Sequence, residues 1–171
     1  MGRRPHPELN MSWSRAALGF LAVAVLILPI AIWKGEQFAE AAVFAALVGW
    51  LSTLTLAQII RITAFLTWLQ IFAPMIGRRK IPLVQNLIAP RRAIWALAVW
   101  SIATALGIAS LLAGFAPGFG MALAGLLCAA LMIARELLAI RSLRHLPAAE
   151  RPAELPPLVL PVPNLTPLQR N

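Results

Sequence analysis

Few side chains in this sequence could do chemistry, and their positions do not suggest a catalytic site. The chain has no Asp, two His (His6 and His145) and one Cys, Cys128. Both histidines lie outside the long apolar segments, so they cannot clamp a haem between membrane helices, and a lone cysteine forms no Cys-based metal site. Proton relays need ionisable groups inside the bilayer, and none interrupts these segments. We therefore expect no catalytic residue, metal or cofactor, and a protein that is not an enzyme.

The best candidate for a polar contact is the pair Gln58 and Arg61. Burying an unpaired amide in lipid costs several kcal/mol, and residues three apart share one helical face. We predict that this pair binds a lipid head group or a partner helix at the membrane boundary. The alternative is an arginine that reaches the head groups beside a surface glutamine. Ser and Thr in the apolar segments should bond their own backbone or a neighbouring helix.

Composition places the chain in a membrane. Its 171 residues are 60% hydrophobic and 12% charged, against about 45–50% apolar and about 25% charged in a soluble domain. The net charge of +9 follows the tendency of Lys and Arg to stay on the cytoplasmic side. We therefore expect no nucleic-acid partner, but attraction to anionic lipid head groups.

Four apolar segments are predicted to span the membrane, since each falls within the required length of about 17–25 residues. They cover residues 16–33, 41–60, 93–114 and 118–140. The first exceeds the usual apolar core of a signal peptide, so we favour a retained helix over a cleaved one. The predicted fold is all-α, an integral membrane bundle of four transmembrane helices.

Residues 62–77 raise the question of topology. If they lie flat, fourteen Lys and Arg are on the cytoplasmic side and only Lys34 is outside; if they cross, four are inside and eleven outside. The bias of cations toward the cytoplasm favours an interfacial helix between spans two and three. The chain is thus expected to be a multi-pass protein of a bacterial-type inner membrane, with both termini cytoplasmic.

The pattern of residues 62–77 agrees with an interfacial position. Thr63, Thr67, Gln70 and Pro74 follow one helical stripe, and an interfacial helix turns such a strip toward the head groups. A shallow re-entrant segment is the alternative. With Gln58 and Arg61, the predicted contacts to lipid or a partner are Thr67, Gln70, Arg78, Arg79 and Lys80.

Three smaller features bear on packing. Small residues recur four apart, as in Ala103 and Gly107, which lets membrane helices approach closely. We interpret Cys128 as a small packing residue. Glu136 cannot face its neighbour Arg135, so it is expected to pair with another cation, Arg91 or Arg92.

The chain divides into a membrane domain over residues 1–145 and a tail over 146–171. The tail holds seven of the fourteen prolines, a composition that favours extended polyproline II over helix. It is either a disordered end or an extended segment that docks on a partner.

Two families resemble this arrangement in outline. Four short spans, an interfacial connector and both ends inside resemble the small membrane subunit of tripartite TRAP transporters, although the polar motif of that family's second span is not evident. The run from Trp95 to Gly120, ending in PGFG, is similar to paraquat-inducible-protein-A-like lipid-transport domains, which have a longer outer segment than residues 34–40. These resemblances imply transport or lipid handling, and neither assigns a functional residue in this chain.

Small size, the lack of catalytic groups and apolar lateral faces favour one function. We expect a non-enzymatic accessory or scaffold subunit of a larger inner-membrane complex, with protein partners in the membrane. The alternative is a transport or lipid-handling component, and a lipid-modifying enzyme comes third.

Overall fold

The computed structural model describes residues 8–72 and 83–147. Within them the chain is helical and contains no strand, which confirms the predicted all-α bundle. The elements in chain order are α1 (Glu8–Lys34), α2 (Glu36–Phe44), the π-helix η1 (Ala45–Ser52), α3 (Thr53–Phe72), the short 3-10 helix η3 (Val84–Leu87), α4 (Pro90–Leu112) and α5 (Ala116–Arg141).

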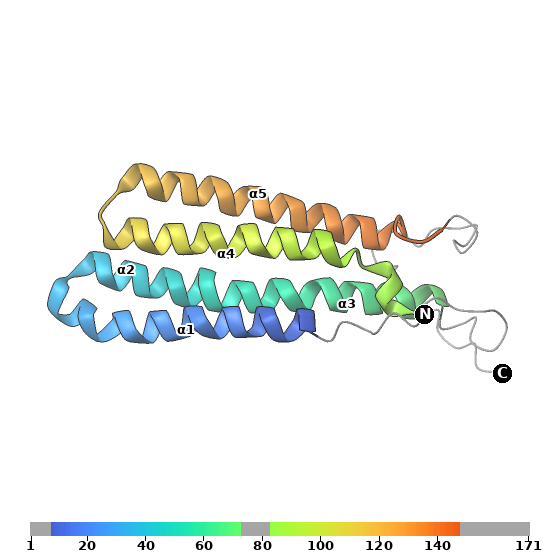
Figure 1. Ribbon diagram of the computed structural model, residues 1–171, viewed down its shortest axis with the longest axis horizontal. Helices are drawn as coiled ribbons and strands as arrows, with labels where there is room; N and C mark the ends of the chain where they lie inside the picture. The colour runs from blue at the N-terminus through green and yellow to red at the C-terminus, as the bar shows by residue number, and fades with distance from the viewer. Residues whose placement is uncertain (1–7, 73–82, 148–171) are drawn as a thin grey trace, which may run out of the picture.

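The elements form four antiparallel rods, because α2, η1 and α3 follow one another without a break (Figure 1). Two short turns reverse the chain at one end, which we call the turn end. Each contains a glycine in the left-handed region, Gly35 at φ 101° and Gly114 at φ 64°. The opposite end carries the start of α1, the α3–α4 connection and the end of α5; we call it the terminal end.

Small residues let the rods approach closely, as the four-residue spacing predicts. A Cβ atom added to Gly107 would lie 2.7 Å from the Phe44 ring, and one added to Gly49 would lie 2.7 Å from Cβ of Phe20. Where helices pack in lipid, such close approach supplies the dispersion contacts that hold them together.

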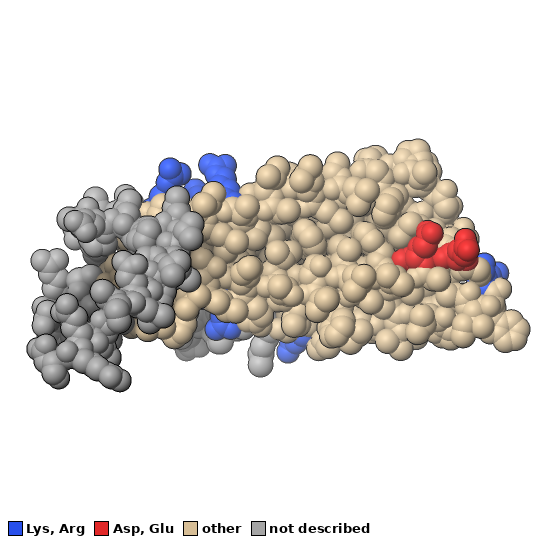
Figure 2. All heavy atoms as spheres, turned by 180° about the vertical axis from the view of Figure 1, so that it is seen from behind, with Lys and Arg blue, Asp and Glu red and all other residues tan. Residues whose placement is uncertain are grey.

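The four rods are long and apolar enough to cross a membrane. Within the described residues the candidate spans are Trp13–Lys34, Glu36–Phe72, Pro90–Leu112 and Ala116–Arg141. Figure 2 shows charged side chains toward the two ends of the molecule, with an uncharged belt between them. Hydroxyls within the second span bond the helix itself: Ser52 Oγ donates to Leu47 O and Thr55 Oγ1 to Leu51 O, both at 2.8 Å.

The second span differs from its predicted form. A separate lateral helix over 62–77 was expected after a span ending near Arg61, but α3 runs through Arg61 to Phe72. No Gly or Pro interrupts residues 53–72, and Ile60, Ala64 and Ile71 form a buried stripe that continues across Arg61. The interfacial position of this segment is therefore not confirmed, and residues 73–77 lie outside the described residues.

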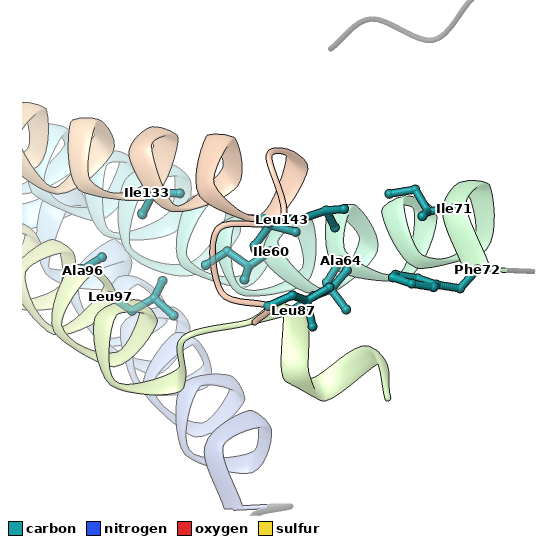
Figure 3. Close-up of a cluster of buried hydrophobic side chains, with 11 residues drawn as sticks. Ile60, Ala64, Ile71, Phe72, Leu87, Ala96, Leu97, Ile133 and Leu143 are labelled. Atoms are coloured by element: carbon teal, nitrogen blue, oxygen red, sulfur yellow. The ribbon is translucent and has the colours of Figure 1, made fainter. Parts of the chain in front are cut away.

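A buried apolar cluster closes the terminal end (Figure 3). It joins α3, η3, α4, α5 and the turn that follows α5, through Ile60, Ala64, Ile71, Phe72, Leu87, Ala96, Leu97, Ile133, Ile140, Leu143 and Leu146. Leu146 is part of this core, so the packed unit extends past the predicted boundary at residue 145. The remainder of the predicted tail, from residue 148, lies outside the described residues. This cluster supports the polar groups of the terminal end.

Candidate functional site at the terminal end

The centre of the candidate site is a buried carboxylate, Glu136 on α5, whose side chain is only 4% exposed. The backbone N–H of Ala89 donates a hydrogen bond to its Oε1 over 3.2 Å. Ala89 is the N-cap of α4, where helical N–H groups lack partners inside the helix and carry partial positive charge. One helix thus caps its neighbour, because Glu136 supplies the acceptor that the N-terminus of α4 needs.

His145 is the second polar group against this carboxylate. Its Nε2 lies 3.0 Å from Oε1 of Glu136, and the ring is largely shielded from solvent. The distance suits an ion pair when the imidazole is protonated, although the contact does not meet the geometry of a hydrogen bond. The carboxylate therefore has an N–H donor on one side and an imidazole on the other.

A strained turn places His145 there. Leu143 has φ 53°, a conformation that costs a non-glycine residue about 1–2 kcal/mol. The bonds Arg144 N to Ala139 O at 3.0 Å and Leu143 N to Ile140 O at 3.1 Å form the Schellman motif that ends many helices. Leu143 is almost fully buried, and burying a leucine contributes about 1.5–3 kcal/mol, so burial offsets the strain. The reversed chain then leads His145 back onto Glu136.

A second polar contact ties α3 to α5. The Arg141 guanidinium donates through Nη1 to Oε1 of Gln70 over 2.6 Å. Together the two contacts join the end of α3, the start of α4 and the end of α5, so they fix the relative positions of three rods at the terminal end.

The chemistry available to this cluster is limited to one carboxylate and one imidazole. In the part of the chain that the structure describes, no group of three His, Cys, Asp or Glu side chains could hold a metal ion. What the arrangement does is hold helices in place: the Ala89–Glu136 and Gln70–Arg141 bonds each join two helices that are distant in sequence, and the His145 contact folds the turn after α5 back onto that helix.

The structure places the predicted contact residues in different surroundings. Gln58 is half-buried and Arg61 is exposed; no hydrogen bond joins them among the described residues, so their contact stays a prediction. Gln70 meets Arg141. Thr67 is fully buried, and its hydroxyl has no partner. The expected polar strip toward the head groups is therefore wrong at Thr67, because the helix turns this residue into the bundle. Arg78, Arg79 and Lys80 lie outside the described residues.

The pairing of Glu136 with His145 differs from the partner that the sequence predicts. We expected Arg91 or Arg92 as the partner, but both are exposed, and the ion pair described for Glu136 is the one with His145. The turn that makes this pairing has Leu at the position where glycine is the usual signal, so no local pattern predicts it. Cys128, interpreted as a packing residue, is exposed on α5.

Two further polar contacts lie within the spans, and the second is of the kind that the sequence predicts for Ser and Thr. Trp100 Nε1 donates to Val48 O over 3.3 Å, where the π-helix η1 passes α4. Thr104 Oγ1 donates to Trp100 O over 2.9 Å. The Trp100 indole and the Thr104 hydroxyl are therefore satisfied inside the bundle, whereas the buried hydroxyls of Thr53 and Ser101 have no hydrogen-bond partner among the described residues.

Four apolar rods with an uncharged belt define a multi-pass membrane protein. Comparison of the chain with protein families, curated proteins and solved structures gives no match.

Proposed function

We propose that this protein is a non-enzymatic accessory or scaffold subunit of a larger membrane complex. The observation that supports this role is an exposed apolar side of α3 that no other helix of residues 8–72 and 83–147 covers. Its large side chains are each about 40–50% exposed, and they follow one helical face opposite the buried stripe. They are Ile59, Ile62, Phe65, Leu66 and Leu69.

The length of this rod distinguishes a protein partner from lipid as the cover. The span Glu36–Phe72 has 37 residues, roughly 50–55 Å of helix, whereas the hydrocarbon core is about 30 Å thick. Arg61 marks a level where a cation reaches solvent or head groups. Ile62, Phe65, Leu66 and Leu69 lie beyond it, over roughly 12 Å of helix, where acyl chains do not reach unless the rod is strongly tilted. A partner helix or an apolar segment of another subunit would cover them.

We further propose that the membrane is a bacterial-type inner membrane and that the terminal end faces the cytoplasm. Arg15, Arg61, Arg91, Arg92, Arg135, Arg141 and Arg144 belong to the terminal half of the rods, whereas Lys34 lies at the turn end with Glu36 and Glu40. Lys and Arg accumulate on the cytoplasmic side of membrane proteins, which supports this orientation.

Site-specific photo-crosslinking in cells tests the role. A photoreactive residue in place of Phe65 should form a discrete adduct with another membrane protein. The matched position is Leu127, which is also exposed and apolar but lies on α5 within the uncharged belt, and it should give none.

Co-purification in mild detergent provides the second measurement. The double variant Phe65→Ala/Leu66→Ala should lose the crosslinked partner, while Leu127→Ala/Leu131→Ala should retain it. A homogeneous homo-oligomer that carries phospholipid and no other protein would contradict the subunit role and favour the lipid-handling alternative.

A further inference from the structure

We infer that α5 carries a binding site for one anionic phospholipid, with its phosphate between Arg135 and Arg144. The site differs from the lipid contact predicted at Gln58 and Arg61, and it does not depend on the proposed subunit role. It rests on a pocket of about 240 Å³ at the terminal end of α5. The residues that line the pocket are Arg135, Leu138, Ala139, Ser142 and Arg144.

The size of the pocket fits part of a molecule. Pockets that enclose a whole drug-sized ligand measure about 300–1,000 Å³, so this smaller pocket suits a head group whose remainder lies outside. It also opens at the surface of a rod that spans the membrane, where the remainder of a lipid has room to extend along the helix.

A stripe on α5 provides the surface for that remainder. Ala124, Cys128 and Leu131 are exposed, and they precede Arg135, Leu138 and Ser142 at spacings of three and four residues, so all six share one face. The stripe changes from apolar in the uncharged belt to cationic at the terminal end. A phospholipid aligned with the helix has the same polarity profile, with its acyl chain in the belt and its phosphate at the boundary.

Charge favours an anion here in spite of the helix end. The C-terminus of α5 contributes about half a negative charge, whereas Arg135 and Arg144 bring two positive charges to the pocket. The last turn is also capped, because Ala139 O accepts from Arg144 N and from Ser142 Oγ. The Ser142 hydroxyl is therefore already engaged, whereas a guanidinium has five N–H donors and can bind a phosphate beside another partner.

Quenching of a fluorescent probe by brominated lipid tests the site. The probe is attached to the native Cys128 of the full-length protein, which is reconstituted in vesicles. Cys128 is the single cysteine of the chain and lies two turns from Arg135 on the same stripe. Phosphatidylglycerol brominated on its acyl chains should quench the probe at a lower mole fraction than brominated phosphatidylcholine does. An arginine near an anionic surface contributes a factor of about five, so we expect a preference between about fivefold and about twenty-five-fold.

The variant Arg135→Gln/Arg144→Gln should lose this preference, and Arg135→Lys/Arg144→Lys should keep most of it. The matched control is Arg91→Gln/Arg92→Gln, which removes the same charge from exposed residues of the terminal end outside the pocket. An unchanged helical circular dichroism spectrum and elution volume show that each variant remains folded.

Three results would overturn the inference. Equal losses in the pocket variant and the control would mean diffuse attraction to the cationic end. A wild-type protein without preference for phosphatidylglycerol would mean that no anionic site exists. Relief of the quenching by millimolar inorganic phosphate would assign the pocket to a soluble anion. Because the assay uses the purified chain alone, a missing protein partner has no effect on it.

Discussion

At the scale of residues, the terminal end depends on a carboxylate that the bundle almost fully encloses. Burying a charge is costly unless it is paired and hydrogen-bonded, and Glu136 has both the Ala89 N–H and the His145 ring beside it. A buried polar contact contributes little net stability compared with a well-packed apolar pair, but removing one partner leaves the other unsatisfied. The value of this cluster is therefore positional: it sets where α4 begins relative to α5.

Replacing Glu136 separates its role as an acceptor from its charge. The variant Glu136→Leu leaves the part-buried Ala89 N–H without its partner and should lower the free energy of unfolding by about 1–3 kcal/mol. Glu136→Gln retains an amide oxygen for that N–H and should lose less. Denaturation of the purified protein in mixed micelles measures both.

One variant serves as the control for this prediction, and one result would contradict it. The variant Glu40→Leu, at an exposed position near the turn end, should change the stability by no more than about 0.5 kcal/mol. Glu136→Leu with the stability of the wild type would mean that water reaches the N-terminus of α4 and that the carboxylate is not needed there.

At the scale of elements, two close crossings between rods depend on small residues, in addition to the large apolar side chains that pack at the terminal end. Gly49 receives Phe20, and Gly107 receives the Phe44 ring, so these two crossings each pair a glycine with an aromatic side chain. The Phe44 ring also stacks edge to face on Phe119, with 5.5 Å between the ring centroids. This arrangement connects α2, α4 and α5 in the turn-end half of the bundle.

Adding one methyl group to a glycine should therefore have opposite effects at two positions. In Gly49→Ala the new Cβ would lie 2.7 Å from Cβ of Phe20, and overpacking of this kind costs about 1–3 kcal/mol. In Gly19→Ala nothing lies within 4 Å, and alanine is favoured over glycine inside a helix by about 0.5–1 kcal/mol.

The thermal midpoints of the two variants in the same detergent measure this difference. Gly49→Ala should fall below the wild type, and Gly19→Ala should equal or exceed it. Equal midpoints for both variants would show that α1 does not pack against η1 as closely as the structure places it.

At the scale of the whole molecule, both described ends of the chain lie on the same side, because the number of rods is even (Figure 1). The connection between α3 and α4 also returns to the terminal end. If the cations of that end stay in the cytoplasm, the turns at Gly35 and Gly114 are the parts of the bundle that face outward.

Cysteine labelling on intact cells tests this orientation. In a Cys128→Ala background, the variant Glu36→Cys in the first turn should react with an impermeant thiol reagent. The variant Pro147→Cys, at an exposed position of the terminal end, should react only after the cells are permeabilised. The reverse pattern would contradict the proposed topology and, with it, the assignment of the terminal end to the cytoplasm.

The sequence predicts those features of the fold that depend on interactions within a single segment. The four spans and the all-α class follow from local quantities, the length and polarity of each segment, because lipid requires backbone groups to bond within the segment itself. The spacing of small residues likewise indicated close packing at Gly107. The expected bonds of span hydroxyls to their own helix form at Ser52, Thr55 and Thr104 but not at Thr53 and Ser101.

Only the tertiary structure decided what the terminal end looks like. The rod through Arg61 to Phe72 is continuous because its buried stripe packs on residues some 70 to 80 positions later, including Ile140 and Leu143. Glu136 meets His145 because burial of Leu143 stabilises a backbone conformation that leucine disfavours on its own. Both outcomes depend on contacts between segments far apart in sequence, and no periodicity within a single segment encodes them.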